Sequence, residues 1–338
     1  MTTPTHTGTK PLPLAALGAL MLLGAAAVLP LVAGASVVDK ATTLLVYLLL
    51  ATSWNLLAGY AGLVSVGQQA FFGLGGYFAL RLVDGGVDAW PALLLGAAGA
   101  ALAAWLLSFY VLRLKDGEFA VATWVLAEAI RILVMLDPLV QGETGTSLIA
   151  LNAVEPTLRR NLAYALALAA LAGVSLLLWW LLRSPTGLAA RALGDDDEAA
   201  VSLGVRAMRT RQLIYVVAAL AAGLAGVIWL ASAITFLPRT NFGVQWSVLM
   251  LFMVLVGGLR SIEGPYIGAL LLFLLQETLG HLGAWYLAGL GALAVACALW
   301  LPDGLAGALR RWRGRPLISL GGHLPASTPV AVERRHTP

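Results

Sequence analysis

The sequence predicts an all-α polytopic membrane protein, and three observations carry this prediction. Of the 338 residues, 60% are hydrophobic and only 11% are charged, with a mean hydropathy of +0.87. A soluble domain carries about 25% charged residues, because its surface faces water. The charged side chains here also gather in short stretches between long apolar runs. Together these features exclude a soluble core, a disordered chain and a disulfide scaffold.

About 20 consecutive apolar residues cross the hydrocarbon core of a bilayer as a helix. We therefore expect about ten transmembrane helices, at residues 12–34, 41–58, 63–82, 90–112, 119–136, 161–182, 212–235, 245–259, 264–281 and 284–301. The first apolar stretch is longer than the core of a signal peptide, which favours an uncleaved helix. The chain thus divides into an N-terminus (1–11), a transmembrane domain (12–301) and a tail (302–338) whose Pro, Arg and Ser content predicts disorder.

Basic residues set the expected orientation. Placing the polar segment 184–211 and both termini in the cytoplasm leaves a roughly threefold excess of Lys and Arg inside, as the positive-inside rule demands. The net charge of +4 has the same origin, so nucleic acid is not expected as a partner. The sequence predicts a multi-pass membrane protein with both termini cytoplasmic.

The sequence lacks the residues that several kinds of chemistry require. No Walker A phosphate loop occurs, so the chain does not bind ATP by that device. The single cysteine, Cys297, provides neither a disulfide nor a cysteine-based metal site. Glu277 and His281 lie four residues apart on one helix face but have no third ligand, which favours a polar pair at the membrane interface over a metal site. No paired catalytic groups lie at membrane depth, which argues against an enzyme.

The second and third expected helices are joined by an unusually polar segment. Asn55 is followed by residues 59–73, which contain Ser65, Gln68, Gln69 and several glycines. Irregular backbone at membrane depth is tolerated only where protein covers it or where it lines a cavity. Close helix packing through small residues explains the glycines equally well. It explains the amides Asn55 and Gln68 less well, because polar groups in hydrocarbon are costly unless they are partnered.

Two further features stand out. Glu128 and Arg131 are three residues apart within the fifth expected helix, close enough to form an intramembrane ion pair, which either braces the bundle or contacts a pathway. In the segment 184–211, the acidic run 195–198 predicts a short helix over 196–203 with Gly204 as its stop signal. Such a surface helix either lies on the membrane or docks into a partner.

Three separated stretches, with a fourth and weaker one, resemble the permease subunits of ATP-binding-cassette importers for branched-chain amino acids. They are residues 55–60 with 67–77, residues 192–205 with 222–226, residues 256–269, and more weakly 118–131 with 142–145. The sequence is more similar to the LivM-type subunit than to its LivH-type partner. It departs from the family at Arg260, where glycine is usual, and in the partial match of residues 141–146.

The resemblance implies a LivM/LivH-like permease bundle that forms a translocation pathway with a second, LivH-like subunit. It implies two ATP-binding subunits on the cytoplasmic side, which hold ATP and Mg, and an extracytoplasmic solute-binding protein. The chain itself would need no cofactor. Branched-chain amino acids are the family's usual substrates, although related permeases carry urea, amides or aromatic acids. The alternatives are a secondary transporter with its own ion coupling, which the docking-type loop argues against, and a lipid-modifying enzyme.

The resemblance and the polar pattern select the candidate site residues. For the translocation pathway they are Asn55, Ser65, Gln68, Phe72, Gly257, Gly258 and Glu263. For docking of an ATP-binding subunit they are Asp197, Glu198, Ala199, Ala200 and Gly204. Glu128 and Arg131 form the expected intramembrane pair.

Overall fold

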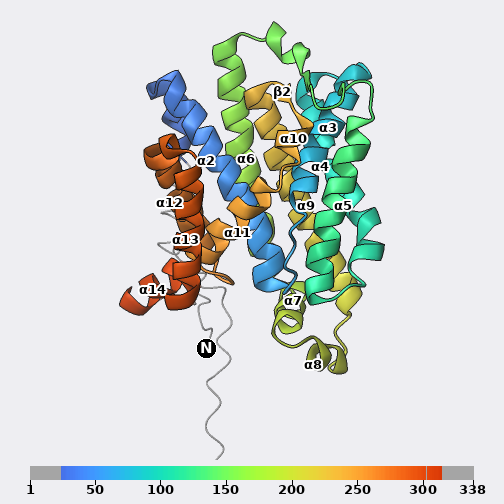
Figure 1. Cartoon of the computed structure of the whole chain (residues 1–338), viewed down its shortest axis with the longest axis vertical. Coiled ribbons are helices and arrows are strands. Elements are labelled where there is room, and N and C mark those ends of the chain that lie inside the picture. Colours follow the sequence, from blue (N-terminus) through green and yellow to red (C-terminus); the bar gives the residue numbers. More distant parts are fainter. Residues whose placement is uncertain (1–23, 302, 314–338) are drawn as a thin grey trace, which may run out of the picture.

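The structure is a computed structural model, and it describes residues 24–301 and 303–313. This part of the chain is predominantly helical (Figure 1). The long helices are α2 (Ala35–Trp54), α3 (Gln69–Asp84), α4 (Ala89–Val111), α5 (Asp116–Met135), α6 (Pro156–Arg183), α9 (Ala207–Ala233), α11 (Gln245–Gly257), α12 (Gly264–Leu279) and α13 (Ala284–Trp300). Shorter ones are α7 (Pro185–Asp195), α8 (Asp197–Ser202), α10 (Pro238–Asn241) and α14 (Gly304–Arg313), and residues 24–32 are also helical.

The connections contain a few short elements. A π-helix (Asn55–Tyr60) extends α2, and 3₁₀ turns cover Ile149–Ala153 and Gly280–Leu282. Strands β1 (Thr146–Ser147) and β2 (Thr235–Phe236) form an antiparallel pair. Figure 1 places this pair at one end of the bundle, with the start of α6, and places α7 and α8 at the other. We call these the sheet end and the α8 end.

Helix α9 lies at the centre, where it contacts α2, α3, α4 and α6. Glycines bring the backbones of these helices close together. A Cβ added to Gly75 of α3 would lie 2.5 Å from the Gly223 carbonyl oxygen of α9, and one on Gly96 of α4 would lie 2.6 Å from the Gly75 oxygen. Close approach through small residues is how transmembrane helices associate. The glycines of α3 therefore serve helix packing.

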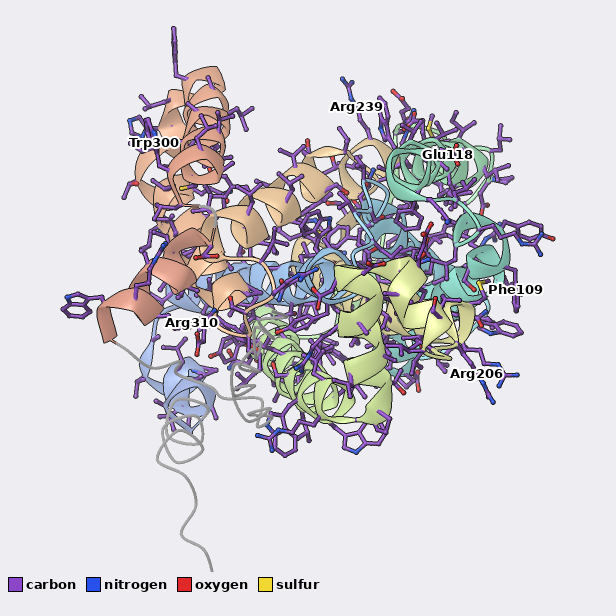
Figure 2. All side chains as sticks on the ribbon, turned by 90° about the horizontal axis from the view of Figure 1, so that it is seen from below. Phe109, Glu118, Arg206, Arg239, Trp300 and Arg310 are labelled. Atoms are coloured by element: carbon purple, nitrogen blue, oxygen red, sulfur yellow. The ribbon has the colours of Figure 1, made fainter. Side chains whose placement is uncertain are left out.

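Large apolar side chains remain exposed on the outside of the bundle. Figure 2 looks at the α8 end and shows Trp300 of α13 and Phe109 of α4 on different sides of the molecule. Their exposed fractions are 79% and 39%, and other exposed apolar residues on these helices include Trp285 and Leu102. Apolar surface of this extent marks a membrane or protein interface.

Within residues 24–301 and 303–313, five helices are long and apolar enough to cross a membrane, and a sixth is added if α13 and α14, which meet at 48°, count as one broken span. The five cover Ala35–Tyr60, Ala89–Val111, Pro156–Arg183, Ala207–Ala233 and Pro238–Gly257. The number of transmembrane helices expected from hydropathy, about ten, is thus not confirmed. Of the other apolar helices, α3 and α12 have 16 residues each and α13 has 17, fewer than the about 20 that cross a bilayer. Helix α5 has 20 residues but carries the charges of Glu118, Glu128 and Arg131.

The structure corrects several expected boundaries. The second helix begins at Ala35 rather than at 41, and the charged Asp39 and Lys40 in its first turns pair at the surface with Arg160 and Glu277. The third begins only at Gln69 rather than at 63, because residues 61–68 are non-helical. Of the first expected helix, residues 12–23 lie outside the described part of the chain.

Two polar segments are more ordered than expected. In the segment 184–211, the acidic helix is preceded by an unexpected one, α7, which Ser184 caps through its Oγ and Pro185 begins. In the tail, expected to be disordered from 302 onward, residues 304–313 form α14. This helix packs where Gly258 and Gly304 approach so closely that a Cβ on Gly304 would lie 2.5 Å from the Gly258 Cα. Residues 314–338 lie outside the described part.

Candidate functional site

The candidate site begins where α2 ends. Its last six residues, Asn55–Tyr60, form a π-helix, a rare conformation that is frequent at functional sites. Residues 61–68 then run without helical structure back into the bundle before α3 begins. Ser65 and Gln68 in this segment are at most 1% exposed. The polar side chains of this irregular segment are therefore covered by protein, as membrane depth requires, whereas Gly62 and Val64 are exposed.

Hydrogen bonds fix the segment 61–68 against neighbouring helices. The Trp54 indole Nε1 donates to the Ser65 carbonyl at 2.9 Å, and Gln68 Nε2 donates to Ser53 Oγ at 3.0 Å. Ser53 Oγ donates in turn to the Ala218 carbonyl of α9 at 2.8 Å. Among the described residues, no donor reaches Gln68 Oε1. The segment thus joins α2 to α9 and keeps one buried acceptor free.

Asn55 holds the turn between α11 and α12 (residues 258–263). Its Nδ2 donates to the Ser261 carbonyl at 2.9 Å, and its Oδ1 accepts from the Arg260 N–H at 3.2 Å. Inside the turn, Ser261 Oγ donates to the Gly258 carbonyl and accepts from the Gly264 N–H, at 2.9 and 2.8 Å. The buried amide therefore fixes a backbone turn through both of its polar atoms.

Arg260 connects this turn to α7. Its backbone is left-handed, with φ of 61°, a conformation that favours glycine. Its guanidinium donates to the Gly194 carbonyl at 2.5 Å and forms an ion pair with the Asp195 carboxylate. Gly194 also packs on the π-helix, since a Cβ there would lie 2.8 Å from the Tyr60 carbonyl oxygen. We call the meeting point of Asn55, Tyr60, Gly194, Asp195 and Arg260 the junction.

Helix α8 follows the junction directly. Asp196 caps it, with the side-chain Oδ1 accepting from the Ala199 N–H at 3.0 Å. At its other end Gly204 has φ of 88° and donates to the Val201 carbonyl, while the Val205 N–H reaches the Ala200 carbonyl at 3.1 Å. This is a Schellman stop. The helix and its glycine stop are confirmed within one residue of the predicted bounds.

The side chains of α8 divide into two groups. Ala200 is only 3% exposed, and Asp197 pairs with Arg211 at 3.2 Å, so both hold the helix against the bundle. Glu198, Ala199 and Gly204 are exposed. So are two apolar side chains that the sequence analysis did not single out, Val201 at 50% and Leu203 at 86%.

The residues expected to form a pathway are all buried within this chain. Ser65, Gln68 and Phe72 lie together beside α9 and α11, where the Phe72 ring lies 4.4 Å from that of Trp246. Asn55, Gly257, Gly258 and Glu263 surround the α11–α12 turn, with Glu263 9% exposed. The structure thus divides the expected pathway residues into two clusters, one at the start of α3 and one at the α11–α12 turn.

Sequence analysis missed the part of the junction contributed by Arg260, Gly194 and Asp195. The one available signal was Arg260 itself, an arginine where the related sequences usually have glycine. Among the described residues, no three His, Cys, Asp or Glu side chains gather to hold a metal ion.

Glu128 and Arg131 form an ion pair on α5. Arg131 Nε donates to Glu128 Oε1 at 2.9 Å, and Arg131 Nη1 lies 3.5 Å from Glu143 Oε1. The pair lines a surface groove of ≈ 720 Å³ between α5 and the α10–α11 segment, together with Trp124 and Arg239. With about half of its side chain exposed, Glu128 sits at the surface rather than in the interior of this chain.

At the sheet end, Asp137 is held by several donors. Its carboxylate accepts from Tyr77 Oη at 2.6 Å, Arg81 Nε at 2.7 Å and the Leu139 N–H at 2.9 Å. Burial alone would raise the pKa of Asp137, but these hydrogen bonds outweigh it and lower the pKa below its ordinary value. The carboxylate therefore anchors the loop after α5 to α3 in its ionised form.

The comparisons with known proteins decide the family. Residues 36–309 match the model of the branched-chain amino acid transport system permease component. The chain belongs to this family.

Two relatives are the high-affinity branched-chain amino acid transport system permease proteins LivM of Escherichia coli K12 and Salmonella typhimurium LT2. They are 29% and 28% identical to the chain over 84% and 85% of its length, which covers 73% of each relative. A shorter match, 33% identical over 35% of the chain and 37% of the relative, is to the autoinducer 2 import system permease protein LsrC of Enterobacter sp. 638. No solved structure matches the chain.

Membership in this permease family gives the function at a coarse level. The chain is a multi-pass inner-membrane permease component of a branched-chain amino acid transport system, and it is not itself an enzyme. The resemblance to LivM-type permeases found in the sequence is thereby confirmed.

Proposed function

We propose that this permease component is one of two membrane subunits of an ATP-driven importer for branched-chain amino acids. A second LivH-like permease subunit, two ATP-binding subunits and an extracytoplasmic solute-binding protein complete the assembly. Helices α3, α5, α12 and α13 cross the membrane together with the five apolar helices given above, and the segment 12–34 adds the tenth span. The α8 end faces the cytoplasm with both termini, and the sheet end faces outward.

The junction is the single observation that carries the coupling mechanism. An ATP-binding subunit docks on α8 through Asp197, Glu198, Ala199, Ala200 and Gly204, where the exposed Val201 and Leu203 supply apolar contact and Ala200 fixes the helix from behind. Movement of α7 and α8 reaches the turn 258–263 through Arg260, and reaches α2 through Asn55. Rigid elements linked in this way move together.

The translocation pathway runs along the face formed by the two buried groups, Ser65, Gln68 and Phe72 on one side and Asn55, Gly257, Gly258 and Glu263 on the other. They lie within this chain in the present conformation, and an outward or inward opening of the paired subunits exposes part of them. The free acceptor Gln68 Oε1 supports this proposal, because buried polar atoms are seldom left without a partner. The Glu128–Arg131 pair braces the outer surface of α5.

Leu203→Glu tests the docking of α8. Leu203 is 86% exposed, so the change leaves the packing of this chain intact while it places a charge in the proposed contact. We expect loss of the ATP-binding subunits on co-purification and loss of ATP-driven leucine uptake in proteoliposomes. Ile149→Glu, at a 74% exposed position of the sheet end, is the matched control and retains assembly.

Two results contradict the proposal. One is an L203E variant that assembles and transports at the normal rate. The other is leucine uptake that an ion gradient drives without any ATP-binding subunit, which would favour a secondary transporter.

A further inference from the structure

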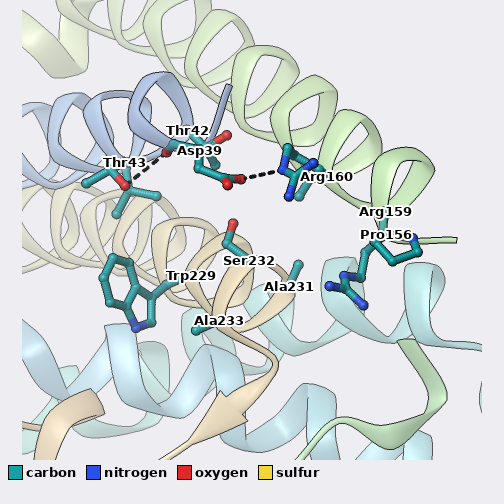
Figure 3. A pocket seen from close by; sticks show the side chains of 12 residues that line it. Asp39, Thr42, Thr43, Pro156, Arg159, Arg160, Trp229, Ala231, Ser232 and Ala233 are labelled. Carbon is teal, nitrogen blue, oxygen red and sulfur yellow. Dashed lines mark hydrogen bonds and ion pairs between the residues drawn. The ribbon is translucent and has the colours of Figure 1, made fainter. Parts of the chain in front are cut away.

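A cavity of ≈ 250 Å³ opens at the sheet end between the first turns of α2, the first turns of α6 and the last turn of α9 (Figure 3). None of the candidate site residues described above lines it. Its polar wall comprises Asp39, Thr43, Arg159, Arg160 and Ser232. Figure 3 shows the carboxylate of Asp39 and the hydroxyl of Ser232 facing each other across the opening.

The rim of the cavity carries one negative and two positive charges. Arg160 Nε donates to Asp39 Oδ1 at 2.9 Å, so these two charges balance. Within the described residues, the one hydrogen bond of the Arg159 guanidinium is a long contact of 3.5 Å with the Leu151 carbonyl. The Asp39 side chain remains 58% exposed. The rim therefore offers a cation for an incoming carboxylate, and a carboxylate with surface left for an incoming ammonium group.

The floor of the cavity is apolar. Val46 and Ala163 are 1% and 2% exposed, and the half-buried indole of Trp229 forms one wall. Charged groups at the mouth and an apolar floor fit an amphipathic molecule whose two opposite charges lie next to each other at one end. An α-amino acid with an aliphatic side chain has this arrangement, and few precisely placed polar groups suffice to orient such a ligand.

We propose that this cavity binds an aliphatic α-amino acid in zwitterionic form. The ligand carboxylate pairs with Arg159, its ammonium group with Asp39, and its side chain rests on Val46, Ala163 and Trp229. The binding is weak, because exposed ion pairs are screened by water. Its role as a receiving site for substrate released at the outer face rests on the proposed function and on the orientation given there.

A thiol placed at the mouth of the cavity tests the proposal. Cys297 is the only cysteine of the chain, so Ser232→Cys combined with Cys297→Ala gives a single reporter at an exposed position. The variant is assembled with its partner subunits in lipid nanodiscs without ATP or binding protein. It is then labelled with a charged maleimide, and the rate is read from the mass of this chain.

Three probes separate the parts of the ligand. L-leucine carries both charges, 4-methylpentanoate lacks only the ammonium group, and isopentylamine lacks only the carboxylate. We expect L-leucine to slow labelling several-fold at a concentration where neither of the other two does. Arg159→Gln and Asp39→Asn each abolish this protection, whereas Arg239→Gln, at the same end but outside the cavity, retains it. A cysteine at Ile149 is labelled at the same rate with and without leucine.

Labelling that L-leucine does not slow overturns the proposal, and so does equal protection by 4-methylpentanoate, which would make the cavity a plain carboxylate site. An unchanged labelling rate of R159Q and D39N without any probe shows that the cavity is intact in both. ATP-driven uptake is measured separately. Normal uptake without protection rejects this inference alone, and protection without ATP-driven uptake rejects the proposed function alone.

Discussion

Arginine–aspartate pairs link separate elements at both ends of the bundle, and Arg81–Asp137 at the sheet end is built differently from Arg260–Asp195 at the α8 end. At the sheet end, the Asp137 side chain is 5% exposed and accepts from Arg81, Tyr77 and a backbone N–H. At the α8 end, the side chains of Arg260 and Asp195 are 50% and 64% exposed. A buried, multiply bonded carboxylate is costly to break, whereas an exposed pair contributes little to stability. The difference indicates a fixed sheet end and a junction that can rearrange.

The largest effect is expected from Asp137→Ala. The change removes the shared acceptor and leaves Tyr77 and Arg81 without it, while the loop after α5 loses its attachment to α3. We expect a thermal midpoint in detergent that falls by several degrees, together with a lower yield of folded protein. Asp84→Ala is the control, because Asp84 contacts the same arginine but is half exposed, and its midpoint stays near that of the native chain.

The pH dependence of stability tests the same role of Asp137. The pKa of Asp137 is lower in the folded protein than in the unfolded chain, so the ionised carboxylate contributes stability above the ordinary aspartate pKa of about 3.9. That contribution is lost as the pH falls through the lowered folded value. The difference in thermal midpoint between native chain and D137A is therefore full at neutral pH and shrinks only in strong acid. A difference that is constant across the whole pH range contradicts the anchor.

An intermediate effect is expected at the junction, from Arg260→Gly. Glycine relieves the left-handed backbone strain at this position and removes the ion pair to Asp195, so the thermal midpoint stays level or rises. The link from α7 to the turn 258–263 is lost, and we expect leucine transported per ATP hydrolysed to fall roughly fivefold or more. Arg260→Lys keeps the positive charge but loses the bidentate geometry of the guanidinium. We expect its ratio of leucine transported per ATP hydrolysed to lie between those of the native chain and R260G.

An R260G variant with lowered stability and normal coupling would reverse the comparison between the ends. It would make Arg260 a structural residue like Arg81. Combining Arg260→Gly with Asp195→Asn adds a further check. Both single changes break the same ion pair, so their effects on coupling should not add in the double variant.

The contrast between the two ends also explains what the sequence could predict. The apolar runs, the acidic start of α8 and its Gly204 stop are local signals, and within the described residues they led to elements that the structure contains. The junction joins residues 55, 194 and 260, which are far apart in the chain, so no local pattern predicts it. Helix α14 was missed for a different reason: the Pro, Arg and Ser content of the whole tail predicts disorder from residue 302, although residues 304–313 consist mostly of the helix formers Ala, Leu and Arg.

The smallest effect concerns the segment 61–68, where packing and pathway remain competing explanations for the polar residues. In the described conformation Val64 is 47% exposed, whereas Ser65 is 1% and Gln68 is 0% exposed. In a Cys297→Ala background, a cysteine at Val64 is therefore expected to react with a polar thiol reagent in the resting complex, and cysteines at Ser65 and Gln68 are not. Gly67 is left unchanged, because a Cβ there would collide with the Thr123 carbonyl.

Adding ATP and a loaded binding protein then separates the two explanations. If the segment borders the pathway, cycling exposes the Gln68 position for part of the time, and its cysteine gains measurable reactivity while the one at Val64 changes little. If the segment serves only packing, Gln68→Cys stays unreactive during transport. Ser53→Cys provides the control. Ser53 accepts from Gln68 and donates to α9, so its place between the helices keeps a cysteine there unreactive toward the thiol reagent in either case.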